Sequence, residues 1–429
     1  MNVQCADNGH YSKSRKSSEW SEHRHRRPIT RRTFVELFTS ADSFLRGEGN
    51  APRSDRSTAA QAQRRDTRRL SLALQGGGAF GAFTWGVLDR LLEEDDLEFD
   101  AVSGASAGAI NAVLLASGLA RGGQDAARAS LERFWSSVGE SRANNVLLRP
   151  EVVVATTSQL SPYQFNPLDL NPLRDLLAQE VDFEAIRRRS PVRLLVSATR
   201  VQDGAVRVFR TKAISLDVVL ASACLPRLHH AVEIHGEAHW DGGYAANPPL
   251  VPLVGASMAS DVLVVHLIPT DHASLPVTKS EIDKRLGQIT FNSPLQKELE
   301  TIGLMKNLVR KEGQPTSRLG RKIEDLQLHH LSAEHHVDGL SQASVLNTDW
   351  AFLIDLKDRG RAAADAWLLD EFSPSGRERG HFPLGGQSSV AGMQHAVDPC
   401  AAEDGTPLLD DKGVRFAGFV LTDVEGRAG

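Results

Sequence analysis

The sequence predicts an α/β protein whose mostly parallel central sheet is covered by helices on both faces. From residue 70 onward, short apolar runs alternate with segments whose apolar residues recur at helical spacing. Such a strand–helix–strand rhythm is typical of a parallel sheet, because parallel strands are joined by crossover helices. The composition is that of a globular chain, with 41% hydrophobic and 24% charged residues among 429.

The expected elements follow in order along the chain. The apolar run 70–75 is typical of a strand buried on both faces, and residues 82–94 carry a helical apolar stripe. A second strand is expected over 99–104, followed by a helix over 106–123 that ends at a pair of glycines. Further strands are expected at 191–201, 205–210, 231–236 and 261–268, and the first two of these are joined by a hairpin at Asp203-Gly204. A later helix is expected at 355–372.

Charge and composition divide the chain into four parts. Residues 1–69 hold 15 Lys and Arg against 8 Asp and Glu, about +7, so the rest carries −5 − 7 = −12. This basic leader is expected to be disordered apart from a short amphipathic helix over 31–45. Its composition favours a solvated tail; the alternative is a segment that contacts anionic head groups at the membrane surface, and no nucleic acid is expected. A catalytic domain (70–254), an α/β extension packed on it (255–372) and an irregular tail (373–429) are expected to follow.

Cysteine usage and hydropathy exclude several classes of protein. The three cysteines are scattered and form no C-x-x-C pair, so neither a disulfide framework nor a zinc site is indicated. No apolar run approaches the roughly 18 residues of a membrane span, and the first 20 residues have no signal-peptide core. We expect a cytoplasmic protein, at most peripheral at the membrane, that uses neither metal nor cofactor.

The second predicted strand ends in a Gly-x-Ser-x-Gly motif, from Gly104 through Ser106 to Gly108. A nucleophile elbow requires this motif between a strand and a helix, where small flanking residues let the serine stand on a sharp turn. The helix N-terminus favours a developing negative charge. Ser106 is therefore the candidate nucleophile, and capping of the following helix is its alternative role.

The first predicted strand ends in a glycine-rich loop with two possible functions. Its glycines, Gly76, Gly77, Gly78 and Gly81, also fit the G-x-G-x-x-G pattern of a dinucleotide-binding turn, with Asp100 as the ribose-binding acid. A serine nucleophile on the neighbouring strand favours another role. Glycine N–H groups unobstructed by Cβ can stabilise the oxyanion of a tetrahedral intermediate, and Gly77 and Gly78 are the expected donors.

A serine hydroxyl needs a base, and the sequence offers a carboxylate for that role. Asp241 follows an apparent strand and precedes Gly242-Gly243, a turn that can hold a carboxylate in a fixed pose or merely close on its own backbone. Histidines are the competing candidates, in the order His229, His230, His235, His239 and His266. His266 alone of these follows Asp241, and its mid-strand position favours a structural role.

Taken in this order, GGGAFG, GASAG and DGG resemble the patatin-like phospholipase family over residues 70–252. The resemblance implies a three-layer patatin-like sandwich with a Ser–Asp dyad at the carboxyl ends of the strands. It makes Ser106 the nucleophile and Asp241 the general base. The segments 289–305 and 355–372 resemble the C-terminal part of bacterial members. One departure is Phe80, which stands where the family most often has Arg or Lys.

The function expected from these residues is hydrolysis of lipid esters through an acyl-enzyme. The substrate class is left open among phospholipids, lysophospholipids, acylglycerols and storage polyesters. Two alternatives remain, a non-catalytic lipid- or partner-binding member of the same fold and, more distantly, a dehydrogenase. Labelling by a fluorophosphonate separates the first two because it requires an activated serine.

Overall fold

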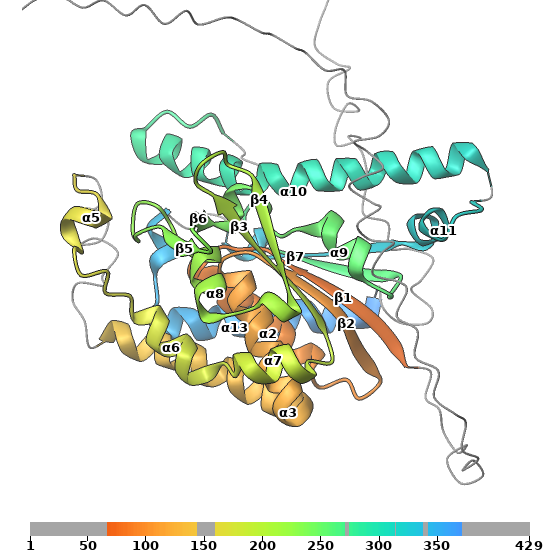
Figure 1. The fold of residues 1–429 in the computed structure, drawn as a ribbon, viewed down its shortest axis with the longest axis horizontal. Helices are drawn as coiled ribbons and strands as arrows, with labels where there is room; N and C mark the ends of the chain where they lie inside the picture. The colour runs from red at the N-terminus through yellow and green to blue at the C-terminus, as the bar shows by residue number, and fades with distance from the viewer. Residues whose placement is uncertain (1–66, 144–158, 271–273, 314, 338–341, 371–429) are drawn as a thin grey trace, which may run out of the picture. The chain divides into compact units, whose positions relative to one another are not determined.

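A computed structural model describes residues 67–143, 159–270, 274–313, 315–337 and 342–370. Within these residues, eight strands form one sheet in the order β5-β6-β3-β2-β1-β7-β8, with β4 paired to β3 (Figure 1). Pairing is parallel from β3 through β2, β1 and β7 to β8, and antiparallel for β4, β5 and β6. The strands are β1 (Arg68–Leu74), β2 (Leu97–Gly104), β3 (Arg193–Arg200), β4 (Val206–Arg210), β5 (Val232–Ile234), β6 (Glu237–Asp241), β7 (Asp261–His266) and β8 (Gln327–Ser332).

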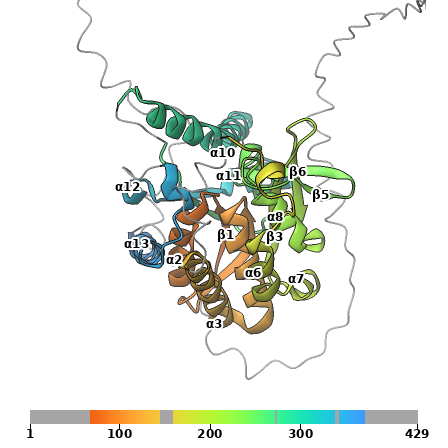
Figure 2. The ribbon, with the colours of Figure 1, turned by 90° about the vertical axis from the view of Figure 1, so that its left-hand side faces the viewer.

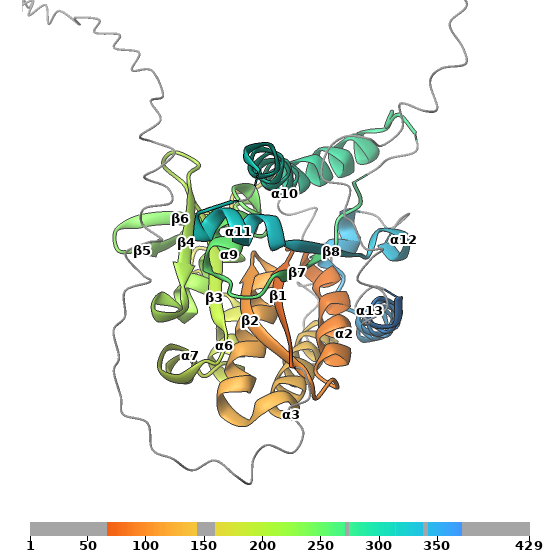
Figure 3. The same ribbon diagram turned by 90° about the vertical axis from the view of Figure 1, so that its right-hand side faces the viewer.

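Helices cover both faces of this sheet (Figure 2 and Figure 3). One face packs against α2, α3 and α13, and the other against α9, α10 and α11. The helices are α2 (Gly81–Leu91), α3 (Ala107–Ala143), α5 (Pro162–Phe165), α6 (Pro172–Glu180), α7 (Phe183–Arg189), α8 (Leu216–Ser222), α9 (Leu250–Ala256), α10 (Lys279–Glu312), α11 (Arg318–Asp325), α12 (Glu334–Val337) and α13 (Trp350–Asp370). The predicted three-layer α/β architecture is confirmed.

Alternation along β1 explains why the sheet has two apolar faces. Leu72 and Leu74 belong to the core shared with α2, α3 and α13, whereas Ala73 between them belongs to the core shared with α9 and α10. Successive side chains of a strand point to opposite faces, so a strand that is apolar throughout is covered on both. All three side chains are fully buried.

Several element boundaries differ from the sequence-based expectation. β1 already begins at Arg68, because Arg68 and Arg69 pair with Leu97 and Glu98 of β2. The expected helix after Ser106 does break at the glycine pair, where Gly123 has a φ of +76°, but helical structure resumes at once and continues to Ala143. The leader up to residue 66, including the helix expected over 31–45, and the tail from 373 lie outside the described residues.

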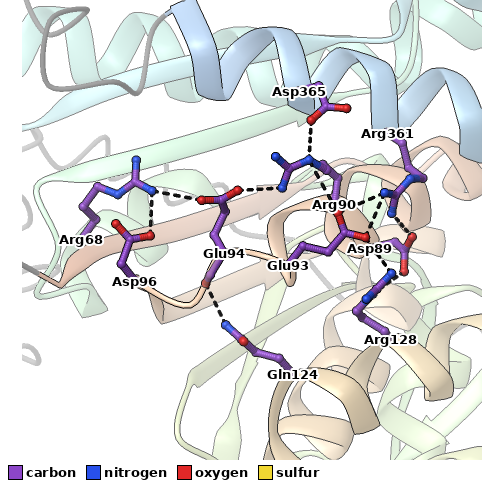
Figure 4. A network of polar contacts seen from close by, with 10 residues as sticks. All are labelled: Arg68, Asp89, Arg90, Glu93, Glu94, Asp96, Gln124, Arg128, Arg361 and Asp365. Carbon is purple, nitrogen blue, oxygen red and sulfur yellow. Dashed lines mark hydrogen bonds and ion pairs between the residues drawn. The ribbon is translucent and has the colours of Figure 1, made fainter. Parts of the chain in front are cut away.

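A network of ion pairs connects α13 to α2 (Figure 4). Arg361 of α13 and Arg128 of α3 both bind Asp89 and Glu93, and Asp365 of α13 binds Arg90. Burial would raise the pKa of Asp89, but the hydrogen bond and charge of Arg128 and the charge of Arg361 lower it below its ordinary value. The network therefore holds Asp89 ionised at the contact between α2 and α13.

Candidate active site

Ser106 lies on a sharp turn between β2 and α3. It is one of the few described non-glycine residues with a positive φ, +52°, and the backbone strain of such a conformation is typical of a nucleophile elbow. A Cβ on Gly104 would lie 2.5 Å from the carbonyl of Gly108, and a Cβ on Gly108 would overlap the carbonyl oxygen of Leu74. Both flanking glycines are therefore sterically required.

Asp241 lies at the end of β6 and is completely buried. Its Oδ1 accepts a 2.7 Å hydrogen bond from the Gly243 N–H, and its own N–H donates to the Cys224 carbonyl at 2.8 Å. Thr199 of β3 donates to its carbonyl oxygen at 2.7 Å. These bonds fix the backbone and one carboxylate oxygen, so the side chain has a single orientation.

The electrostatics of Asp241 suit a group that exchanges a proton near neutrality. Complete burial raises its pKa to about 7, against the opposing effects of the Ser106 hydroxyl and the Gly243 N–H, which stabilise the carboxylate. Its Oδ2 is buried and forms no hydrogen bond of ordinary geometry with a described residue. The structure thus brings Ser106 and Asp241 together and leaves one carboxylate oxygen available to accept a proton.

The glycine loop follows β1, directly beside this pair. The last paired residues of β1 and β2 are Leu74 and Gly104, so the loop after one strand meets the elbow after the other. A Cβ on Gly76 would lie 2.7 Å from the Cβ of Ser106. Only glycine can bring the loop backbone this close to the nucleophile.

The four loop glycines differ in what their N–H groups bind. The N–H of Gly76 donates to Asn247 Oδ1 at 2.8 Å, and that of Gly81 donates to carbonyl groups of the preceding turn. The N–H groups of Gly77 and Gly78 have no such acceptor among the described residues. The oxyanion role of the four glycines stays a prediction; among them, Gly77 and Gly78 are the candidate donors whose N–H groups are not already bound.

A buried polar network behind the loop was not found by sequence reasoning. Gln75 is fully buried; its Oε1 accepts from the Leu267 and Ile268 N–H groups, and its Nε2 donates to Asn292 Oδ1 at 2.9 Å. Nε2 of His266 bonds to the same Asn292 oxygen at 3.0 Å. Amide side chains give little sequence signal, because Gln75 could equally have ended a strand at a surface.

The histidines lie outside the Ser106–Asp241 contact. No hydrogen bond joins either residue to a histidine within the described part of the chain. His266 is buried in β7, where burial lowers its pKa, and His230 stacks on Tyr163 with ring centroids 4.1 Å apart. His239 is buried in β6 against Phe209. Their positions agree with structural roles.

The described residues contain no group of three or more His, Cys, Asp or Glu side chains arranged to hold a metal ion. No helix among them is both long and apolar enough to span a membrane.

The fold is α/β and places Ser106 on a strained turn beside Asp241, and comparison with known proteins identifies a family with a matching domain. Residues 72–254 match the family model of the patatin-like phospholipases. The uncharacterized protein YjjU of Escherichia coli strain K12 is 28% identical over 225 residues, which cover 51% of this chain and 57% of YjjU. The match thus spans little more than half of that relative.

Solved structures give more distant matches. VipD from Legionella pneumophila has 16% sequence identity and a TM-score of 0.35, over 70% of this chain and 67% of VipD. A structure of the ExoU–SpcU complex from the type III secretion system of Pseudomonas aeruginosa has 15% identity and a TM-score of 0.26, over 71% of this chain and 75% of that one.

Proposed function

We propose that this protein hydrolyses carboxylic esters of lipids, with Ser106 as nucleophile and Asp241 as its general base. The observation that carries the proposal is the contact between a serine on a strained elbow and a buried carboxyl group with a pKa of about 7. A base of that pKa is half ionised near neutrality and strong enough to accept a hydroxyl proton as the C–O bond forms.

The reaction follows from the positions of these groups. Asp241 takes the Ser106 proton while Oγ attacks the ester carbonyl, and the negative charge of the tetrahedral intermediate develops on the carbonyl oxygen. The N–H groups of Gly77 and Gly78 are the proposed donors to that oxygen. Collapse expels the alcohol, which takes the proton back from Asp241. Water, deprotonated by the same carboxylate, then hydrolyses the acyl-enzyme and restores Ser106.

The lipid substrate is supported by the family and by the apolar surroundings of the site. Tyr244 directly follows Asp241-Gly242-Gly243 and packs against Phe291 of α10, with ring centroids 4.9 Å apart. Aromatic walls of this kind suit an acyl chain better than a polar substrate. Phospholipids and lysophospholipids are the substrates we propose; the storage-polyester alternative predicts turnover of a hydroxyalkanoate oligomer instead.

Fluorophosphonate labelling and lipid hydrolysis test the dyad. Ser106→Ala should abolish both, and Asp241→Asn should lower the rate of each by about a thousandfold or more, since the hydroxyl loses its base. The double variant should be no worse than Ser106→Ala. Ser103→Ala is the matched control, because Ser103 is a buried serine near the end of β2, three residues before Ser106. An unlabelled wild type would favour the non-catalytic alternative, and full activity in Asp241→Asn would disprove the dyad.

A further inference from the structure

The N-terminal half of α10 carries an apolar stripe that no described element covers. Ile282, Leu286 and Ile289 recur at i, i+4 and i+7, so they share one side of the helix, and all three are exposed. Leu275 and Val277, just before the helix, are exposed by 83% and 74%. The core contacts of α10 lie farther along the helix, through Leu295, Leu299 and Ile302. We call residues 275–289 the α10 rim.

Two residues after the α10 rim, the same helix contacts the turn that follows Asp241. Phe291 packs on Tyr244, and its carbonyl accepts a hydrogen bond from Asn247. A Cβ on Gly243 would lie 2.6 Å from the Phe291 ring, so the ring closes directly over the turn that holds Asp241. The α10 rim is thus continuous with the wall of the site.

A second exposed apolar group lies around α5. Leu168 and Leu170 are exposed by 78% and 68%, and Tyr163 is exposed on its outer side. On its inner side Tyr163 stacks on His230, whose carbonyl accepts from the Cys224 thiol at 3.0 Å. Cys224 in turn accepts the Asp241 N–H. We call residues 160–170 the α5 rim; it too is connected to the turn of Asp241, through these contacts.

The charges on the α10 rim are compatible with a lipid surface. Of the acidic residues over 274–289, Glu281 closes a capping box with Thr278 and Asp283 pairs with Lys279 at 2.6 Å. Both carboxylates are therefore compensated locally, and the Lys279 side chain is 91% exposed. An anionic or zwitterionic head group meets no uncompensated negative charge along this stretch.

We propose that the α10 rim and the α5 rim together form a docking surface for a lipid bilayer beside the Ser106–Asp241 site. The proposal rests on the proposed function. A bilayer is the occupant because the rims expose aliphatic side chains with no uncompensated negative charge on the α10 rim, and because its ester bonds must reach Ser106. Exposed aliphatic side chains that enter the interface are stabilised by burial among acyl chains.

Paired variants on one helix test this surface. The double variant Leu286→Asp/Ile289→Asp alters the α10 rim, and Leu304→Asp/Leu308→Asp is its matched control. The two pairs are equally exposed: 57% and 47% for the side chains of the first pair, 60% and 49% for those of the second. The control pair lies about 27 Å farther along α10, at 1.5 Å per residue. Binding to vesicles of phosphatidylcholine and phosphatidylglycerol is measured by sedimentation at low and high salt, with hydrolysis of vesicle lipid and of a soluble p-nitrophenyl ester.

The rim variant should bind vesicles and hydrolyse vesicle lipid at least about tenfold less well at both salt concentrations, because two apolar side chains are lost from the interface. Its soluble-ester turnover and fluorophosphonate labelling should be unchanged, and the control variant should match wild type throughout. Equal losses in both variants, or none in either, would overturn the proposal.

Other occupants of the surface give different results. A concentration-dependent dimer that Leu286→Asp/Ile289→Asp dissociates would assign the surface to a second copy and overturn the proposal. Vesicle binding that appears only after residues 371–429 are removed would assign it to the chain's own tail, with the same consequence. Failure of the proposed function is distinguishable, since wild type would then bind vesicles through the rim without fluorophosphonate labelling.

Discussion

The backbone N–H of Gly76 donates a 2.8 Å hydrogen bond to Oδ1 of Asn247, and so joins the glycine loop to the segment that follows Asp241. Asn247 is fully buried, and its amide nitrogen donates to the Phe291 carbonyl at 3.0 Å. One side chain therefore sets the position of the proposed oxyanion donors relative to both the base and α10.

Asn247→Ala should leave substrate binding intact and misplace the loop. We expect kcat to fall by about ten- to a hundredfold with KM little changed, because a donor displaced by a few tenths of an ångström stabilises the oxyanion less. Steady-state kinetics on a soluble ester measures the split. Ser71→Ala is the control. Ser71 lies in β1, and its replacement removes a buried 2.8 Å hydrogen bond to Ser257, so stability should fall without a change in kcat. A raised KM at constant kcat would instead make Asn247 a substrate-binding residue.

Gly77→Ala and Gly78→Ala should differ in severity. A Cβ on Gly77 meets Leu267 at 3.2 Å in extended backbone, so the loop can accommodate it with a small shift. Gly78 has a φ of +56°, and a Cβ there would overlap the Val345 carbonyl, so the loop must move. We expect Gly78→Ala to lower kcat by about a hundredfold, equivalent to roughly 3 kcal/mol, and Gly77→Ala by less. Thermal unfolding of both variants shows whether the loop has only a structural role. A lower melting temperature with an unchanged kcat would mean that the loop contributes to packing and not to catalysis.

The pH dependence of activity should follow Asp241. The carboxylate is the active form, so kcat should rise with pH and level off above about 7, the pKa that burial gives this group. Glu298 also has its pKa raised to about 7 by burial, yet it accepts the Val251 N–H at the start of α9. Glu298→Gln should therefore keep the pH–rate profile, and a profile that moves with Glu298 would contradict the assignment of the base.

Stability should depend on pH in the opposite direction. The pKa of Asp241 is 3.8 in its ordinary state and about 7 when folded, so the folded state binds the proton more tightly. Its favourable contribution is complete below the ordinary pKa and is lost as pH rises through about 7. Thermal unfolding across this range should show wild type losing stability and Asp241→Asn losing less. An Asp241→Asn curve parallel to wild type would mean that Asp241 is already ionised throughout.

Salt dependence should distinguish binding by the basic leader from binding by the docking surface of the two rims. Removal of residues 1–66 should weaken binding to anionic vesicles at low salt only, since each basic residue near the surface contributes about 1 kcal/mol and is screened within a Debye length. Turnover of a soluble ester should survive, because β1 begins at Arg68. Identical binding by both forms at low salt would make the leader a passive tail.

The parts of this protein that are predictable from its sequence are those with a strong local signal. Apolar runs identify β1, β2, β3 and β7, and the Asp203-Gly204 turn identifies the β3–β4 hairpin, where Gly204 has a φ of +70°. Ser106 and Asp241 stand in short motifs whose glycines are required because a larger side chain would clash with neighbouring atoms. Because a strand's apolar pattern does not reveal its neighbours, the sheet order required the structure.

What the sequence could not supply is the long-range polar contacts. Gln75 and Asn292 are 217 positions apart, and neither lies in a pattern that predicts the other. β8 escaped prediction because His329 and His330 interrupt its apolar run, although it pairs with β7 along six residues. The exposed stripe of α10 was also hidden, since a helix that is apolar on two sides is typical of a buried one.

The docking of α13 on α2 has a consequence for the order of folding during synthesis. α2 begins at the end of the glycine loop, and its contact with α13 is so close that a Cβ on Gly86 would overlap the Lys357 carbonyl. Residues 350–370 leave the ribosome long after residues 76–91 and the serine elbow. Helix α2, which supports the loop, is therefore packed against α13 only late in synthesis. The proposed lipid hydrolysis would then begin on a nascent chain only after almost all of the described fold has been made.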